Sequence, residues 1–179
     1  MKKIYILMLL CWSVLLVGCG SKTSFSITFD EFSFKFYDNN KQYITLPSGT
    51  SSIGMKVLTE MKEKTVEGNT GFINSLIIIR MPIQSGISIK QLVESNTNKL
   101  QLNLLKYKST DNASKKVKCD DLQYSGYVTA FSYLLDNQSL YGGQYFFIDE
   151  QALYLLSLSS DDQKDITSFI KSIGTLKCN

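Results

Sequence analysis

The C-terminal half of the chain contains three apolar runs separated by two very short polar segments, and this pattern constrains the fold most strongly. The runs are 127–135, 140–148 and 152–159, and the polar segments are 136–139 and 149–151. Segments this short join antiparallel neighbours, because a parallel pair needs a crossover of a dozen or more residues. The sequence therefore predicts an antiparallel meander.

Further runs in the N-terminal half also predict strands. Residues 25–36 alternate aromatic or apolar side chains with polar ones, a period of two that is typical of strands. A short strand is expected at 43–46, one with a wet face at 53–63, and a β-branched central strand at 74–83. Pro82 marks the end of that strand, because proline cannot donate to the hydrogen-bond ladder.

Two segments change to a helical period. Ser88 and Gln91 fit a capping box, and apolar residues then recur on one face across 89–105. Residues 160–163 form a second such box ahead of a helix with one apolar stripe, and Gly174 is its expected C-cap.

The order of these elements predicts the fold class. Residues 109–114 are expected to form a polar loop, and 117–122 to begin the next strand region. The chain then runs as strands, helix, strands, helix. That order predicts an α+β fold, in which a central helix and a C-terminal helix pack on an antiparallel sheet.

The N-terminus has the three-part pattern of an export signal. Residues 1–3 are cationic, residues 4–17 are almost entirely apolar, and Gly18 and Cys19 follow. The apolar run is shorter than the roughly 18 residues that a membrane-spanning helix needs. It therefore predicts a cleaved signal peptide at 1–18 rather than a transmembrane anchor.

The segment Leu16-Val17-Gly18-Cys19 resembles the lipobox of bacterial lipoproteins. The resemblance implies that the Cys19 sulfur carries a diacylglyceryl group, that a signal peptidase cuts before Cys19, and that a fatty acid such as palmitate can acylate the new amine. Several acyl chains give firm anchoring, whereas one chain binds a membrane weakly. The other interpretation is an ordinary cleaved signal with a coincidental cysteine. In a cell with two membranes, Gly20 favours the outer membrane.

The rest of the chain fits one domain held close to that membrane. Residues 19–24 form the lipidated cysteine and a tether that reaches at most about 18 Å. Removing 18 of the 179 residues leaves 161, so 25–179 is expected to be a single domain. The 19 basic residues less Lys2 and Lys3 leave 17, against 16 acidic residues. This balance gives no electrostatic footprint for nucleic acid.

The cysteines predict one disulfide. Cys11 leaves with the signal peptide and Cys19 carries lipid, so Cys119 and Cys178 remain in an exported domain. An even number of cysteines in an oxidising compartment favours a Cys119–Cys178 bond. The alternative is two free thiols. Zinc is not expected, because two isolated cysteines without histidine cannot complete a tetrahedral site.

The layout also resembles a known family. A Phe-rich first strand with the sequence FSFKFYDN, short strands, one helix, a long meander and a capped terminal helix are similar to the PsbP/Mog1-like fold. The resemblance implies a binding or adaptor subunit, because members share no catalytic constellation and several bacterial members are lipid-anchored. Only the element order and the first strand carry this likeness.

The residue types point away from catalysis. The sequence has no histidine, which excludes Ser-His-Asp and Cys-His catalysis and the usual zinc, copper and non-haem iron sites. No catalytic residue, cofactor or metal site is expected. The paired carboxylates at 120–121, 149–150 and 161–162 fall at expected turns or helix starts, where they bind backbone N–H groups.

The sequence therefore favours a non-enzymatic accessory or adaptor module that binds another envelope protein. Tyr141, Tyr145 and Phe147 share the strand face whose exposure would support such binding, although core packing is the commoner role of such aromatics. The alternative is a carrier or sensor of a small apolar or lipid ligand, which needs an enclosed apolar cavity. An enzyme would need converging carboxylates. The partner's identity and the oligomeric state stay open.

Overall fold

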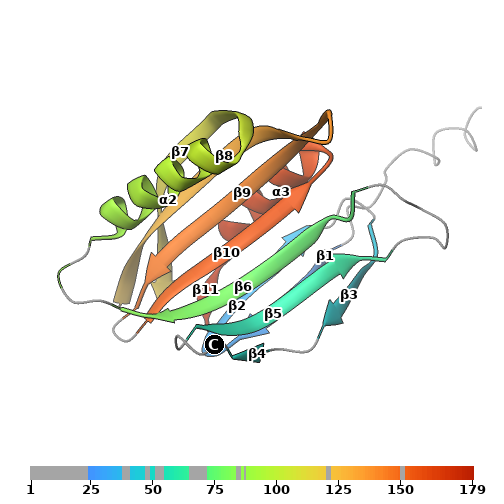
Figure 1. The fold of residues 1–179 in the computed structure, drawn as a ribbon. Helices are drawn as coiled ribbons and strands as arrows, with labels where there is room; N and C mark the ends of the chain where they lie inside the picture. The colour runs from blue at the N-terminus through green and yellow to red at the C-terminus, as the bar shows by residue number, and fades with distance from the viewer. Residues whose placement is uncertain are drawn as a thin grey trace, which may run out of the picture.

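The computed structural model describes residues 24–37, 41–46, 49–50, 55–64, 72–83, 86, 88–119, 122–149 and 152–179. These residues form one large sheet and two helices (Figure 1). The elements are β1 (Ser24–Phe29), β2 (Phe32–Tyr37), β3 (Tyr43–Leu46), β4 (Gly49–Thr50), β5 (Lys56–Glu63), β6 (Ser75–Pro82), α2 (Ile89–Asn103), β7 (Leu105–Cys119), β8 (Leu122–Leu135), β9 (Gln138–Ile148), β10 (Ala152–Ser160), α3 (Gln163–Ile173) and β11 (Lys177–Cys178).

The sheet has eleven strands in the order β1-β2-β11-β7-β8-β9-β10-β6-β5-β3, with β4 paired to β5. Neighbours pair antiparallel except β11 and β7, which run parallel. The α+β class is therefore confirmed. Within the described residues, no helix is both long and apolar enough to cross a bilayer.

The predicted meander is confirmed as β8, β9 and β10. Asp136 and Asn137 join β8 to β9 with positive φ angles of 49° and 64°. Two consecutive left-handed residues make the type I′ turn that matches the twist of paired strands. The turn therefore fixes the register in which Leu135 lies opposite Gln138.

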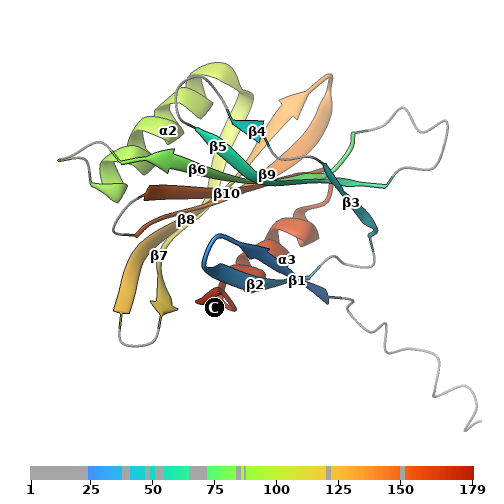
Figure 2. The same ribbon diagram turned by 90° about the horizontal axis from the view of Figure 1, so that it is seen from below.

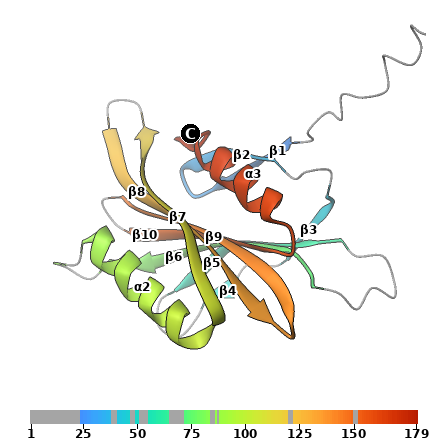
Figure 3. The same cartoon turned by 90° about the horizontal axis from the view of Figure 1, so that it is seen from above.

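The two helices pack on opposite faces of the sheet, which corrects the expectation of a central helix beside the C-terminal one (Figures 2 and 3). On one face, Val93 of α2 packs with Phe146 and Leu153. On the other, α3 contacts β2, β9 and β10. Successive strand side chains point to opposite faces, so the meander supplies a core to each helix.

The main core lies on the α3 face, where the β1–β2 hairpin also lies. The Phe32 ring is 4.9 Å from Phe147 and 5.2 Å from Tyr154, measured between centroids. The Phe147 and Tyr154 rings stack at 4.7 Å. These edge and stacked contacts join the first hairpin to the meander across a long sequence separation.

The alternating run at 25–36 forms a hairpin. Asp30 has a φ of 44° and turns the chain, so that Phe29 lies opposite Phe32. Aspartate tolerates this left-handed conformation better than most residues. The turn keeps Ile27, Phe29, Phe32, Phe34 and Phe36 buried.

The expected polar loop at 109–114 is wrong. Residues 105–119 form the single strand β7, paired with β8 through register shifts between Leu105 and Lys108 and between Ser109 and Asp111. The shifts place extra residues in β7, as in β-bulges, which bend a strand without ending it. Pairing with a long apolar neighbour thus overrides the polar composition.

The helix caps are confirmed in part. Gln91 N donates to Ser88 Oγ at 3.3 Å and Ser88 N donates to Gln91 Oε1 at 2.9 Å, which completes the first capping box. In α3 the N-cap is Asp162 rather than Ser160, since Asp162 accepts from Lys164 N at 2.8 Å. Gly174 is the C-cap, as expected.

Candidate functional site

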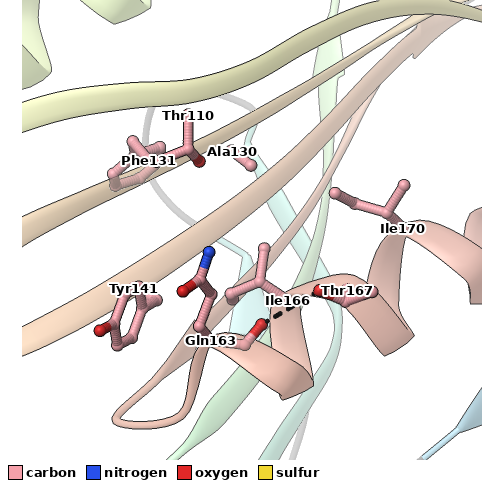
Figure 4. A pocket seen from close by; sticks show the side chains of 8 residues that line it. All are labelled: Thr110, Ala130, Phe131, Tyr141, Gln163, Ile166, Thr167 and Ile170. Carbon is pink, nitrogen blue, oxygen red and sulfur yellow. Dashed lines mark hydrogen bonds between the residues drawn. The ribbon is translucent and has the colours of Figure 1, made fainter.

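A groove lies between the N-terminal half of α3 and the neighbouring strands β7, β8 and β9 (Figure 4). Its volume is about 250 Å³, and it is open to solvent. One wall comes from α3 and the other from β7, β8 and β9. The lining residues are Thr110, Ala130, Phe131, Tyr141, Gln163, Ile166, Thr167 and Ile170.

A glycine in β9 sets how closely α3 approaches the sheet. A Cβ at Gly143 would lie 2.8 Å from Phe169 Cδ1 and 3.2 Å from Ile166 Cγ2. Phe169 and Ile166 are both buried, so α3 rests directly on this glycine. The close packing fixes one wall of the groove beside Tyr141.

The groove combines an apolar floor with a neutral polar rim. Ala130, Ile166 and Ile170 provide apolar surface, whereas Gln163, Thr167 and Thr110 provide amide and hydroxyl groups. Thr167 Oγ1 donates to the Gln163 carbonyl at 3.4 Å, which fixes the hydroxyl against α3. No carboxylate, lysine or cysteine is among the eight lining residues. This arrangement is suited to binding an uncharged group rather than to acid–base chemistry.

The aromatic face expected at Tyr141, Tyr145 and Phe147 is exposed only at its Tyr141 end. Tyr145 and Phe147 are fully buried beneath the first hairpin and α3. Burial raises the pKa of Tyr145 far above its usual value. Its hydroxyl donates to the Lys115 carbonyl at 3.3 Å. Tyr145 and Phe147 therefore have the core-packing role that is commoner for such aromatics, and Tyr141 alone joins the groove.

The carboxylates considered in the sequence do not gather at the groove. Asp149 accepts from Ala152 N at 2.6 Å and so closes the β9–β10 turn. Asp162 caps α3, and Asp161 lies 3.5 Å from Lys41 Nζ. Asp120, Asp121 and Glu150 lie outside the described residues. Asp149 and Asp162 therefore have the structural roles that their positions predict, whereas Asp161 lies in an ion pair with Lys41.

A charged cluster beside the start of α3 had no counterpart in the sequence analysis. Lys41 Nζ donates to the buried Asp165 carboxylate at 2.8 Å and lies 3.6 Å from Glu63. Ser160 Oγ also donates to Asp165, at 2.6 Å. Burial lowers the Lys41 pKa, but the hydrogen bond to Asp165 and the charges of Asp165, Glu63 and Asp161 outweigh it and raise the pKa.

A second cluster joins the β1–β2 turn to the sheet. Arg80 Nε lies 3.5 Å from Asp30, and the Tyr154 hydroxyl donates to Asp30 at 3.1 Å. Burial and the nearby charges of Asp149 and Asp30 raise the pKa of Glu31. Each cluster contains a contact between residues more than a hundred positions apart, Lys41 with Asp165 and Asp30 with Tyr154. No local sequence pattern predicts such contacts. Within the described part of the chain, no three carboxylate or cysteine groups form a metal site.

The predicted disulfide partners are placed only in part. Cys178 is disulfide-bonded. Lys177 of β11 pairs in parallel with Lys118 of β7, so the following residues, Cys178 and Cys119, occupy neighbouring strands. The side chain of Cys119 and the whole of Cys19 lie outside what the structure describes. The Cys119–Cys178 pairing and the lipidation of Cys19 therefore stay predictions.

Comparison with known proteins gives no family. The sequence matches no protein-family model and no curated protein. LpqN of Mycobacterium tuberculosis, described as involved in cell envelope biogenesis, is a solved structure with 9% identity and a TM-score of 0.49, covering 87% of this chain and 90% of that chain. Protein PA94 of unknown function from Pseudomonas aeruginosa has 10% identity and a TM-score of 0.47, covering 84% and 91%. Likeness at this level carries no argument about function.

Proposed function

We propose that this chain is a lipoprotein anchored through Cys19 on the exported side of a membrane, and that its domain is a non-enzymatic accessory module that binds another envelope protein. The proposed binding site is the groove between α3 and the β7–β9 region. A segment of the partner that presents an apolar side chain between neutral polar groups would fit it.

The observation that carries the proposal is the chemistry of the groove. Its apolar floor of Ala130, Ile166 and Ile170 would bury an apolar side chain, and the Gln163 amide and Thr167 hydroxyl would bind the partner's backbone. Protein interfaces typically combine an apolar centre with a polar rim in this way. No lining residue carries a charge at neutral pH, so we propose no enzymatic activity.

The sequence supports the anchored location. The Leu16-Val17-Gly18-Cys19 segment resembles a lipobox, and β1 begins at Ser24, five residues after Cys19. A tether of that length spans at most about 18 Å. The domain would therefore stay near the bilayer. In a cell with two membranes, Gly20 favours the outer one. We also propose that the elements of the domain follow the PsbP/Mog1-like arrangement.

The groove also distinguishes this proposal from the alternative of a small-ligand carrier. Carrier sites enclose most of the surface of their ligand. The hollow at α3 is open, and the side chains between the sheet and α3, among them Phe169, Phe147 and Leu156, are fully buried. An open groove suits a side chain that belongs to a larger partner.

Site-specific photocrosslinking in living cells tests this function. A benzophenone amino acid at Thr167, which is exposed on the groove wall, should give a discrete protein adduct. The matched control places the same amino acid at Thr28, on the outer side of β1 and also exposed. The Cys19→Ala variant should lose the Thr167 adduct, because the unanchored domain no longer stays near its partner.

Two results would count against the proposal. An adduct that forms equally from Thr28 would show that proximity rather than the groove produces it. A Thr167 probe that captures no protein, in cells where the anchored protein is present at normal abundance, would show that the groove has no protein partner. Mass spectrometry of the adduct would identify the partner.

A further inference from the structure

Three leucines are exposed together at one end of the sheet. Leu102 is 86% exposed, Leu105 66% and Leu135 48%. Leu102 lies in the last turn of α2, and Leu105 begins β7. Leu105 pairs with Leu134, so it shares the face of Leu134, and Leu135 lies on the opposite face. The leucines therefore expose apolar side chains on both faces of this end of the sheet, at the α2–β7 junction and the β8–β9 turn. Such a patch marks a contact with a protein or a membrane.

Lysines surround these leucines. Lys99 lies one helical turn before Leu102, and Lys106 and Lys108 line one hollow together with Leu134. All three lysines are exposed. Asp136, in the β8–β9 turn, is the acidic residue nearest in this stretch of backbone. The leucine tip, defined as Leu102, Leu105 and Leu135 with Lys99, Lys106 and Lys108, therefore has three lysines and one aspartate around its leucines, a net positive charge.

We propose that the leucine tip docks on the surface of a bilayer that contains anionic lipids. Leucines this exposed protrude from the protein, so they can enter the boundary between headgroups and acyl chains. Lysines beside them can keep their ammonium groups among lipid phosphates, because a long stem lets the charged end reach the interface. Exposed leucine with surrounding lysine is the composition of segments that lie in a membrane interface.

The backbone at the tip keeps the lysines and leucines in place. Lys106 has a φ of 51°, within the register shift between Leu105 and Lys108. A bulge of this kind redirects the side chains next to it. The shift leaves both Leu105 and Lys106 exposed at the end of the strand, although side chains alternate between faces in a regular strand.

This inference rests on the proposed lipid anchor and goes beyond it, since the anchor alone would leave the domain free to rotate. A docked tip would fix the orientation of the domain on the bilayer. It would also hold Tyr141, which borders both the groove and the hollow that Lys106 and Lys108 line, near the headgroups.

Tryptophan quenching by brominated lipids tests the docking. The sequence has a single tryptophan, Trp12, so Trp12→Phe removes all tryptophan whether or not the signal peptide is cleaved. In this background, Leu105→Trp reports on the tip and Ile83→Trp is the control. Ile83 is also an exposed apolar residue, and it directly follows β6, before α2 begins. Full-length protein isolated from membranes is reconstituted into vesicles of phosphatidylcholine with or without phosphatidylglycerol.

Acyl-chain bromine should quench Leu105→Trp at least about twofold more than Ile83→Trp, because an interfacial segment enters to ~5–10 Å. The difference should be larger with phosphatidylglycerol. The combined variant Lys99→Gln, Lys106→Gln and Lys108→Gln should remove that additional quenching. Equal quenching at both positions, or none at Leu105→Trp in protein that floats with the vesicles, would overturn the docking and leave the anchor intact. Protein that does not float would overturn both.

Discussion

At the scale of single residues, Gly143 decides how α3 meets the sheet. A methyl group there would lie 2.8 Å from Phe169 Cδ1, and Phe169 is fully buried and cannot move aside. We therefore expect Gly143→Ala to lower the free energy of unfolding by about 1–3 kcal/mol, the usual cost of overpacking. Urea unfolding followed by circular dichroism measures it.

The control for this prediction is Gly49→Ala. Nothing lies within 4 Å of a Cβ at Gly49, so this change should alter stability by less than about 0.5 kcal/mol. An unfolding midpoint for Gly143→Ala equal to that of Gly49→Ala would mean that α3 does not rest on Gly143.

Lys41 is the second residue whose change the structure predicts. Its side chain is half-buried beside the buried Asp165 carboxylate, so Lys41→Met should cost about 2 kcal/mol by removing the cation that faces this carboxylate. The Lys41 pKa is raised above its ordinary 10.5 by Asp165, Glu63 and Asp161, which outweigh burial. The ion pair therefore contributes fully below pH 10.5, and its contribution is lost as the pH rises through the folded pKa.

The measurement is the difference in unfolding free energy between the natural protein and Lys41→Met, from about pH 8 to about pH 11. This difference should stay constant and then shrink above about pH 10.5. Lys90→Met is the control, because the Lys90–Glu94 pair is exposed with its charges 3.9 Å apart. Its cost should be below about 0.5 kcal/mol. A pH-independent difference for Lys41→Met would contradict the ion pair.

At the scale of elements, α2 depends on its capping box. Ser88→Ala removes the acceptor for Gln91 N, so it should cost about 1 kcal/mol of stability. Ser95→Ala, at an exposed position within α2, should be neutral or slightly stabilising, because alanine has the better helix propensity. Thermal unfolding distinguishes the two. Equal midpoints would show that the cap contributes nothing.

Elements with short-range signals are those that the sequence predicts well. The Ser88–Gln91 box and the Asp136–Asn137 turn each lie within four residues, and both are confirmed. The polar stretch of β7 was predicted as a loop, because its strand conformation depends on pairing with β8 rather than on its own composition. The helical pattern of α2 likewise does not predict which face of the sheet it covers, because that depends on tertiary packing rather than on the helix's own sequence.

The candidate site shows the same limit. Tyr141 was identified from strand parity, but parity could not tell that the first hairpin and α3 cover Tyr145 and Phe147. The opposite wall comes from α3, for which the sequence predicts an apolar stripe but not the surface that the stripe covers. A groove between two elements is a property of their packing, so its parts can be predicted while the groove itself cannot.

At the scale of the whole molecule, one short strand joins the β1–β2 hairpin to the rest of the sheet. β11 has two residues, yet it lies between β2 and β7 and pairs with both. Cys178 within it is disulfide-bonded. If its partner is Cys119, as the sequence predicts, the bond closes a loop of about 60 residues and stabilises the fold by about 4 kcal/mol on the chain-entropy model.

This arrangement predicts where the molecule opens when the bond is removed. Cys178→Ser should speed hydrogen exchange first in β11 and β2, because a two-residue strand has few backbone bonds of its own. Exchange in β8, β9 and β10 should change little, since each of these pairs along most of its length on both sides. Hydrogen exchange with mass spectrometry measures both regions in one experiment. Cys119→Ser should give the same pattern if it is the partner, and a different pattern would assign Cys178 another partner. Equal acceleration across all these strands would mean that the sheet opens as one unit, and that β11 does not divide it.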